Sequence, residues 1–161
     1  MKTNTSMDKL LQVYGETESR QFSLSSKLST LLESRIEERD KTFCFTSLRS
    51  TISEPVMFFG DLTGYECAVN HIHIDDFLEP GSQQKQGLLF RSAIAFAYRL
   101  KEKLISTFPK QNFNIILGYS LGNPPGCTVR FHKIRENESW ISDNLDGYEA
   151  EAVMVLDTPE E

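Results

Sequence analysis

Residues 87–120 read GLLFRSAIAFAYRLKEKLISTFPKQNFNIILGYS, and this stretch decides the fold. Its first part repeats apolar residues at helical spacing and stops at Pro109, which cannot continue a helix. Its second part, from Phe113 to Tyr119, has an apolar residue at every other position, which is the period of a β-strand. The sequence therefore predicts a long helix that crosses one face of a sheet. The apolar stripe of that helix is Leu89, Ala93, Phe96, Ala97, Leu100, Leu104 and Phe108.

Further strands are predicted on both sides of this stretch. Downstream, a Gly- and Pro-rich turn at residues 122–126 leads into a strand at 129–133, and residues 150–156 form a last strand. Hairpin-length connections favour antiparallel pairing over a doubly wound parallel fold. The predicted class is α+β, with a mostly antiparallel sheet of about five to six strands. Upstream, β-branched and aromatic runs predict strands at 42–46, 56–59 and 65–74, the last two joined as a hairpin.

Helices complete the predicted architecture. A second, N-terminal amphipathic helix is expected over residues 23–39, where leucines recur at helical spacing, and either it or water covers the second sheet face. Ser82, after Pro80 and Gly81, is a candidate N-cap of the long helix. Residues 1–20 are expected to form a loose arm or a short helix at 7–14. One domain spans residues 1–161.

Charge limits the class of partner. The chain has 23 acidic and 17 basic residues, a net charge of −6 and a pI near 5.1, which opposes nucleic-acid binding and favours a cationic partner. The acids concentrate in residues 136–161, a region without Lys or Arg. They are Glu136, Glu138, Asp143, Asp146, Glu149, Glu151, Asp157, Glu160 and Glu161.

Cysteine spacing and hydropathy indicate a cytoplasmic protein. Cys44, Cys67 and Cys127 are far apart and show no CxxC pattern, so we expect small buried residues and not a disulfide framework or a zinc site. The N-terminus has no apolar segment typical of a signal peptide, and no stretch approaches the ~18 apolar residues of a membrane span. The expected location is the cytoplasm, without membrane contact.

The histidines leave a second interpretation open. His71 and His73 project from one face of a predicted strand, and with the distant His132 they could hold zinc or iron. His71-x-His73 with Glu79 resembles the first cupin motif, and Gly118 with the segment 124–126 resembles part of the second. The resemblance implies a metal-dependent enzyme or a cupin-like metal-binding protein. The spacing departs from the cupin pattern, however, because His132 lies too far beyond Gly126, so we expect no metal and no cofactor.

The segment SWISDNLDGYEAEAVMVL, residues 139–156, places the only tryptophan of the chain in an acidic loop that leads into a strand. Aromatic residues of this kind often anchor protein interfaces. With the small size, the negative charge and the α+β pattern, this segment resembles the immunity proteins of bacterial polymorphic toxins and contact-dependent growth inhibition systems.

The resemblance implies a non-catalytic inhibitor that binds a cognate toxin domain, commonly a basic nuclease. We expect a cytoplasmic protein that is not an enzyme, has no cofactor and forms a monomer or a dimer. A non-catalytic adaptor or assembly subunit is the remaining alternative. The residues expected to bind the toxin are Trp140, Asp143, Asp146, Tyr148, Glu149 and Glu151.

Overall fold

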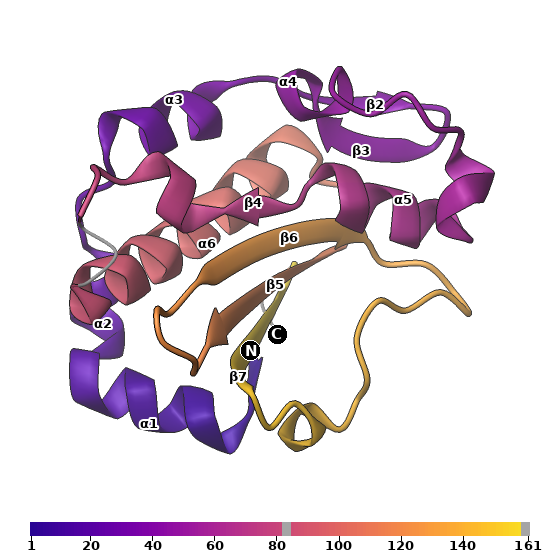
Figure 1. Ribbon diagram of the computed structural model, residues 1–161. Helices are drawn as coiled ribbons and strands as arrows, with labels where there is room; N and C mark the ends of the chain where they lie inside the picture. The colour runs from indigo at the N-terminus through magenta and orange to yellow at the C-terminus, as the bar shows by residue number, and fades with distance from the viewer. Residues whose placement is uncertain (82–84, 159–161) are drawn as a thin grey trace.

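A computed structural model of the protein describes residues 1–81 and 85–158. This part of the chain centres on a five-stranded antiparallel sheet with the strand order β1-β7-β5-β6-β4 (Figure 1). The predicted α+β class with an antiparallel sheet is therefore confirmed. Long ladders join β7, β5 and β6, and the two edge strands are short, which leaves little exposed edge. The strands are β1 (Lys2–Thr3), β4 (Ile72–His73), β5 (Phe113–Ser120), β6 (Cys127–Lys133) and β7 (Glu151–Asp157).

Helix α6 (Gln86–Thr107) packs on one face of this sheet, as predicted (Figure 1). Residues Leu89, Phe96 and Leu100 of its stripe are fully buried against side chains of β5, β6 and β7. Each Leu or Phe that is buried in this way stabilises the fold by ~1.5–3 kcal/mol relative to exposure. Ser82, the predicted cap of the helix, lies outside the described residues.

The helix predicted over residues 23–39 is only partly correct. Helix α3 (Ser26–Glu33) ends early, and Ile36–Arg39 instead forms β2, which pairs with β3 (Thr42–Phe45). The hairpin turn explains the difference, because Asp40 and Lys41 both have positive φ angles, 51° and 65°, as a two-residue turn requires. Ile36 is buried in the hairpin, so an apolar residue at this position fits both the predicted helix and the observed strand.

The strands predicted at 56–59 and 65–74 are wrong, apart from the two residues of β4. Val56–Phe59 forms the 3-10 helix η1, and Leu62–Val69 forms α5. The side chain of Asp61 accepts a hydrogen bond from the Gly64 amide at 2.6 Å and so begins a helix where a hairpin turn was expected. Strand-forming residues are accommodated in α5 because packing against β3 and β6 overrides their intrinsic preference. Short helices α4 (Thr46–Arg49) and η2 (Ile74–Phe77) complete this half of the chain.

The N-terminal segment is not a loose arm. It forms β1, α1 (Thr5–Tyr14) and α2 (Glu16–Arg20), so the alternative of a short helix at residues 7–14 is confirmed. Met7 and Leu11 of α1 join the core, and β1 pairs with the C-terminal strand β7. The start and the end of the described chain therefore lie side by side in the sheet (Figure 1).

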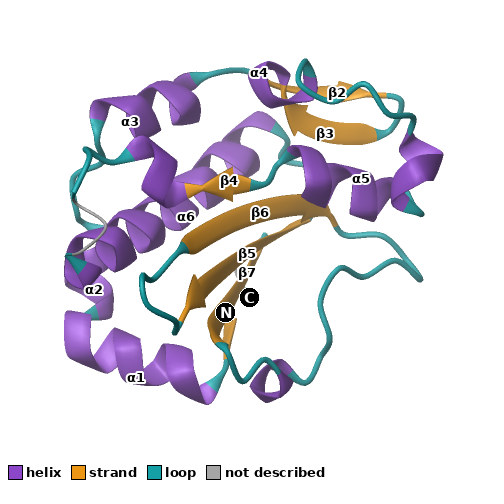
Figure 2. Cartoon of the chain, in the orientation of Figure 1, coloured by secondary structure: helices purple, strands orange, loops and turns teal. Residues whose placement is uncertain are grey.

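A long loop covers the sheet face opposite α6. Residues 134–150 leave β6, include the single helical turn η4 (Leu145–Gly147), and return to β7 (Figure 2). Leu145 packs on Ile116, Val153 and Val155, which point away from α6. The sequence-based expectation was that the helix at 23–39 or water covers this face, but the loop at residues 134–150 covers it.

Candidate functional site

Residues 136–150, the part of the predicted acidic region 136–161 that precedes β7, are called the acidic loop below. A loop of this length with little regular structure is uncommon in a compact domain and is often functional. In most of its acids the side chain is exposed, and the loop contains no Lys or Arg. Glu160 and Glu161, which the sequence groups with these acids, lie outside the described residues.

The first end of the acidic loop is anchored by a buried ion pair. Arg135 binds both carboxylate oxygens of the fully buried Glu66, at 2.7 Å and 2.9 Å. The same carboxylate accepts hydrogen bonds from the amides of Phe43 and Lys133, both at 2.7 Å. Burial has the largest single effect and lowers the pKa of Arg135, but the hydrogen bonds to Glu66 and the charges of Glu66, Glu138 and Asp61 together raise it overall. The ion pair therefore ties the loop to α5, β3 and β6.

Glu138 has a structural role although the prediction counted it among the surface acids. Its Oε2 accepts hydrogen bonds from the amide and the hydroxyl of Thr63, at 3.0 Å and 2.7 Å. It also lies 4.0 Å from Arg135. These contacts fasten the loop to the first turn of α5.

The second end of the acidic loop is anchored by the N-terminal segment. The Thr5 amide donates to Asp146 Oδ1 at 2.8 Å, and this hydrogen bond lowers the pKa of the Asp146 carboxyl. Asn4, which is buried, donates to the carbonyls of Leu145 and Glu151 and accepts from the Val153 amide at 3.0 Å. Asp146, one of the predicted toxin-binding acids, therefore already takes part in an internal contact.

The other predicted residues divide into two groups. Asp143 and Glu149 are exposed and form no hydrogen bond or ion pair with any residue in the described ranges 1–81 and 85–158. Trp140, Tyr148 and Glu151 instead line a cavity between the loop and the sheet. Tyr148 is half-buried, and its hydroxyl accepts a hydrogen bond from the Ser142 amide at 3.1 Å. All the predicted residues therefore lie on the loop or at its junction with β7. Asp143 and Glu149 lie on the solvent-exposed surface, whereas Trp140, Tyr148 and Glu151 line the cavity.

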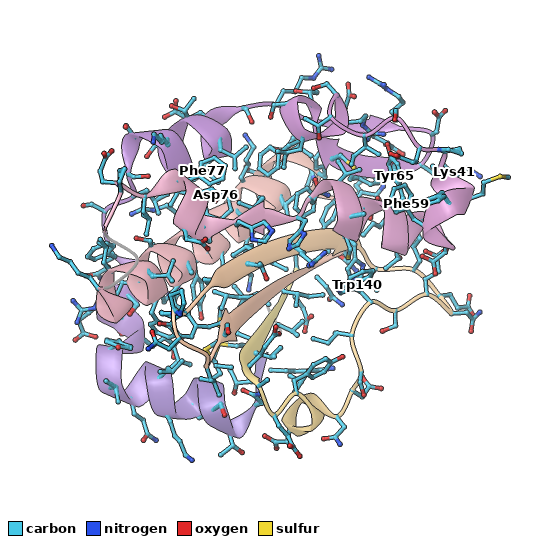
Figure 3. All side chains as sticks on the ribbon, in the orientation of Figure 1. Lys41, Phe59, Tyr65, Asp76, Phe77 and Trp140 are labelled. Carbon is cyan, nitrogen blue, oxygen red and sulfur yellow. The ribbon has the colours of Figure 1, made fainter. Side chains whose placement is uncertain are left out.

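The cavity, called the sheet cleft below, has a volume of about 280 Å³. Ile116, Gly118 and Val153 form part of its floor, and Trp140 and Tyr148 form part of its loop side. A Cβ atom at Gly118 would lie 3.1 Å from Glu151 Oε2, so a larger residue there would require this carboxylate to shift by a few tenths of an ångström. Figure 3 shows Trp140 between the loop and β6.

Arg130 is a residue of the cleft that sequence reasoning missed. From β6 it donates to the Cys67 carbonyl at 3.0 Å and lies 2.9 Å from His71 Nε2, and its guanidinium lies 5.1 Å from the centre of the Trp140 ring. No carboxylate lies within 4.0 Å of this cation in residues 1–81 and 85–158. The signal in the sequence was its position between Val129 and Phe131, which directs it away from the core.

A family model described as the Uncharacterized protein PM0498 family matches residues 2–161. The chain belongs to this family. The match includes every strand of the sheet, both anchors of the acidic loop and the sheet cleft. No curated protein and no solved structure matches the chain.

The histidines of this PM0498 family member do not converge on a metal position. His71 and His73 pack with ring centres 4.2 Å apart, and His71 Nε2 faces the Arg130 cation. His132 is buried on β6, where its Nδ1 contacts the Lys133 carbonyl. Residues 1–81 and 85–158 contain no group of three or more His, Cys, Asp or Glu side chains with the geometry to hold a metal ion. Within the described residues, the alternative ligand set His71, His73 and His132 is not brought together in a metal-binding geometry.

Burial sets the protonation state of several groups in this PM0498 family member. It lowers the pKa of His71 to about 4, with further contributions from Arg130 and His73, so the imidazole is neutral at pH 7 and can accept a hydrogen bond from Arg130. All three cysteines are buried, as predicted, and burial raises the pKa of the Cys44 thiol to about 12. In the described ranges, no helix has the length and apolarity that a bilayer crossing requires.

Proposed function

We propose that this member of the PM0498 family is an immunity protein that binds and neutralises a basic, nuclease-like toxin domain. The observation that carries the proposal is the acidic loop itself. It holds exposed acids on a backbone that Glu66, Arg135, Asn4 and Thr5 fix at both ends. A fixed loop loses less conformational entropy when a partner binds than a flexible loop does.

Electrostatics explains why such a surface suits an inhibitor. Among the described residues no cation pairs with Asp143 or Glu149, so their field extends into solvent. A field of this sign attracts a cationic protein, raises the association rate and weakens as salt is added. Trp140 is 43% exposed and can add an aromatic contact at the edge of the same loop.

The proposal assigns no catalytic step to this chain. The buried thiols are poor nucleophiles because burial keeps them protonated, and His71 is occupied by Arg130. The acidic residues would occupy the surface with which a basic enzyme holds its anionic substrate. A cytoplasmic location, where an imported toxin would act, completes the proposal.

The proposal is tested by capture followed by a growth assay. The tagged chain is used to capture partners from its native cells at low and at high salt. An Asp143→Lys/Glu149→Lys variant is compared with Glu33→Lys/Glu38→Lys, whose exposed acids lie on α3 and β2, outside the acidic loop. Both variants change the net charge from −6 to −2.

We expect a basic protein that the wild type and the α3/β2 variant capture at low salt and that the loop variant does not. When expressed alone, the captured protein should stop growth, and co-expression of the wild-type chain should restore it. Capture that is equal for both variants, or a captured protein that is harmless when expressed alone, would contradict the proposal.

An assembly role is the second candidate, because η1 exposes two large apolar side chains. Met57 is 82% exposed and Phe58 is 72% exposed, next to each other at one end of the molecule. Adjacent apolar side chains of this size are typical of contact surfaces. If this role is correct, the purified chain forms a defined oligomer that the Met57→Ser/Phe58→Ser variant dissociates, as measured by light scattering. A wild-type mass that equals the monomer would exclude self-assembly.

A further inference from the structure

The sheet cleft contains a cation whose hydrogen-bonding capacity is only partly used. The guanidinium of Arg130 has five N–H bonds, of which one donates to Cys67 and one to His71. The remaining N–H bonds have no acceptor in the described part of the chain, and Arg130 lines the cleft. A guanidinium with N–H bonds available suits a carboxylate.

A carboxylate is present at another point of the same cleft. Glu151 begins β7, and its Oε2 lies over Gly118, where a Cβ atom would be 3.1 Å away. Arg130 pairs in register with Ile116, two residues from Gly118 on the neighbouring strand, so the Cα atoms of Arg130 and Gly118 are roughly 8 Å apart. Arg130 and Glu151 influence each other electrostatically but do not form an ion pair within 4.0 Å.

Apart from these charges, the cleft is lined largely by apolar side chains. Ile116 and Val153 form the floor, and Trp140 and Ile141 face them from the loop. The volume of about 280 Å³ equals the volume that roughly nine water molecules occupy in the liquid. It lies just below the usual range of ligand pockets, so the cleft fits a small ligand. The positively charged Arg130, the negatively charged Glu151 and the apolar lining are complementary to a molecule with a carboxylate, an ammonium group and a short apolar side chain.

We propose that the sheet cleft binds a small zwitterion of the α-amino acid class, with its carboxylate on Arg130 and its ammonium group on Glu151. The neutral His71 and the Cys67 carbonyl hold the guanidinium in place and leave its other N–H bonds for the ligand. The inference does not depend on the proposed function, because it uses the inner side of the loop and not the exposed Asp143 and Glu149.

The position of Trp140 provides the measurement. It is the only tryptophan of the chain and it lines the cleft, so its fluorescence reports binding there. The purified full chain is titrated with each of the twenty common free amino acids at millimolar concentrations. For every amino acid that binds, the matching carboxylic acid without the amine and the matching amine without the carboxylate are titrated as well. Calorimetry confirms each saturable signal.

We expect at least one amino acid to bind saturably and its two truncated forms to bind at least about tenfold more weakly, because each lacks one charge-assisted hydrogen bond. Glu151→Gln should weaken the amino acid but not the carboxylic acid, and Arg130→Gln should weaken both. Arg130→Lys keeps the positive charge and serves as the second variant if Arg130→Gln fails to fold. The absence of saturable binding by any amino acid, or equal binding of an amino acid and its deaminated form, would overturn the inference.

Discussion

At the scale of single residues, the fold depends on polar side chains buried where several elements meet. Glu66 binds Arg135 and two backbone amides, and Asn70 bonds the backbones of β3 and β6. Sequence reasoning could not identify these roles. Both residues lie in the run 65–74 that the residue types assigned to a strand, and the value of a buried carboxylate depends on partners that are distant in sequence.

The Glu66→Gln variant tests the ion pair. Glutamine leaves the Arg135 cation buried without a counter-charge, so we expect the free energy of unfolding to fall by ~3–5 kcal/mol. Urea denaturation of the purified protein measures this value, and the exposed Glu38→Gln is the control, with an expected change below ~0.5 kcal/mol. Equal denaturation midpoints for wild type and Glu66→Gln would mean that the ion pair does not hold the loop.

The pKa of His71 predicts a pH dependence. Its folded-state pKa of about 4 lies below the ordinary value of 6.5, so the unfolded chain takes up this proton first as the pH falls. The contribution of His71 to stability is therefore complete above pH 6.5 and is lost as the pH falls towards 4. An NMR titration of the imidazole should give a midpoint near 4, and Arg130→Gln should move it upward. A midpoint near 6.5 would show that His71 does not accept from Arg130.

At the scale of elements, the sequence predicted the long ones and failed on most of the short ones, although the strand predicted at 42–46 is present as β3. Helix α6 and strands β5, β6 and β7 each repeat their period over several residues, which makes the pattern unambiguous. A four-residue element has too few positions to show a period. The acidic loop was recognised from its composition, but Arg130 was missed because one outward basic residue on a strand is usually only a surface residue.

The Asn4→Ala variant tests how the N-terminal segment fixes the acidic loop. Alanine removes the cap of α1 and leaves the buried Val153 amide without its acceptor, so we expect a loss of ~2 kcal/mol or more in the free energy of unfolding. Hydrogen exchange should also accelerate at residues 145–153. The matched control is Ser25→Ala, which removes the cap of α3 and should leave exchange in this region unchanged. Unchanged exchange in Asn4→Ala would contradict the anchoring role of this residue.

At the scale of the whole molecule, one sheet separates two regions with different composition. The α6 side is a continuous apolar core, and the opposite side carries an anchored loop with exposed acids above a small charged cleft. The net charge of −6 adds a long-range attraction for a cationic partner to the attraction of the acidic loop itself.

The role of the acidic loop is tested by the rate at which the chain associates with the basic protein that it captures, measured by stopped flow at low and high ionic strength. We expect a fast association that slows as salt is added, a slower and less salt-dependent association for Asp143→Lys/Glu149→Lys, and a smaller effect for Glu33→Lys/Glu38→Lys. If the two variants, which have the same net charge, slow association equally, the acidic loop is not the toxin-binding surface.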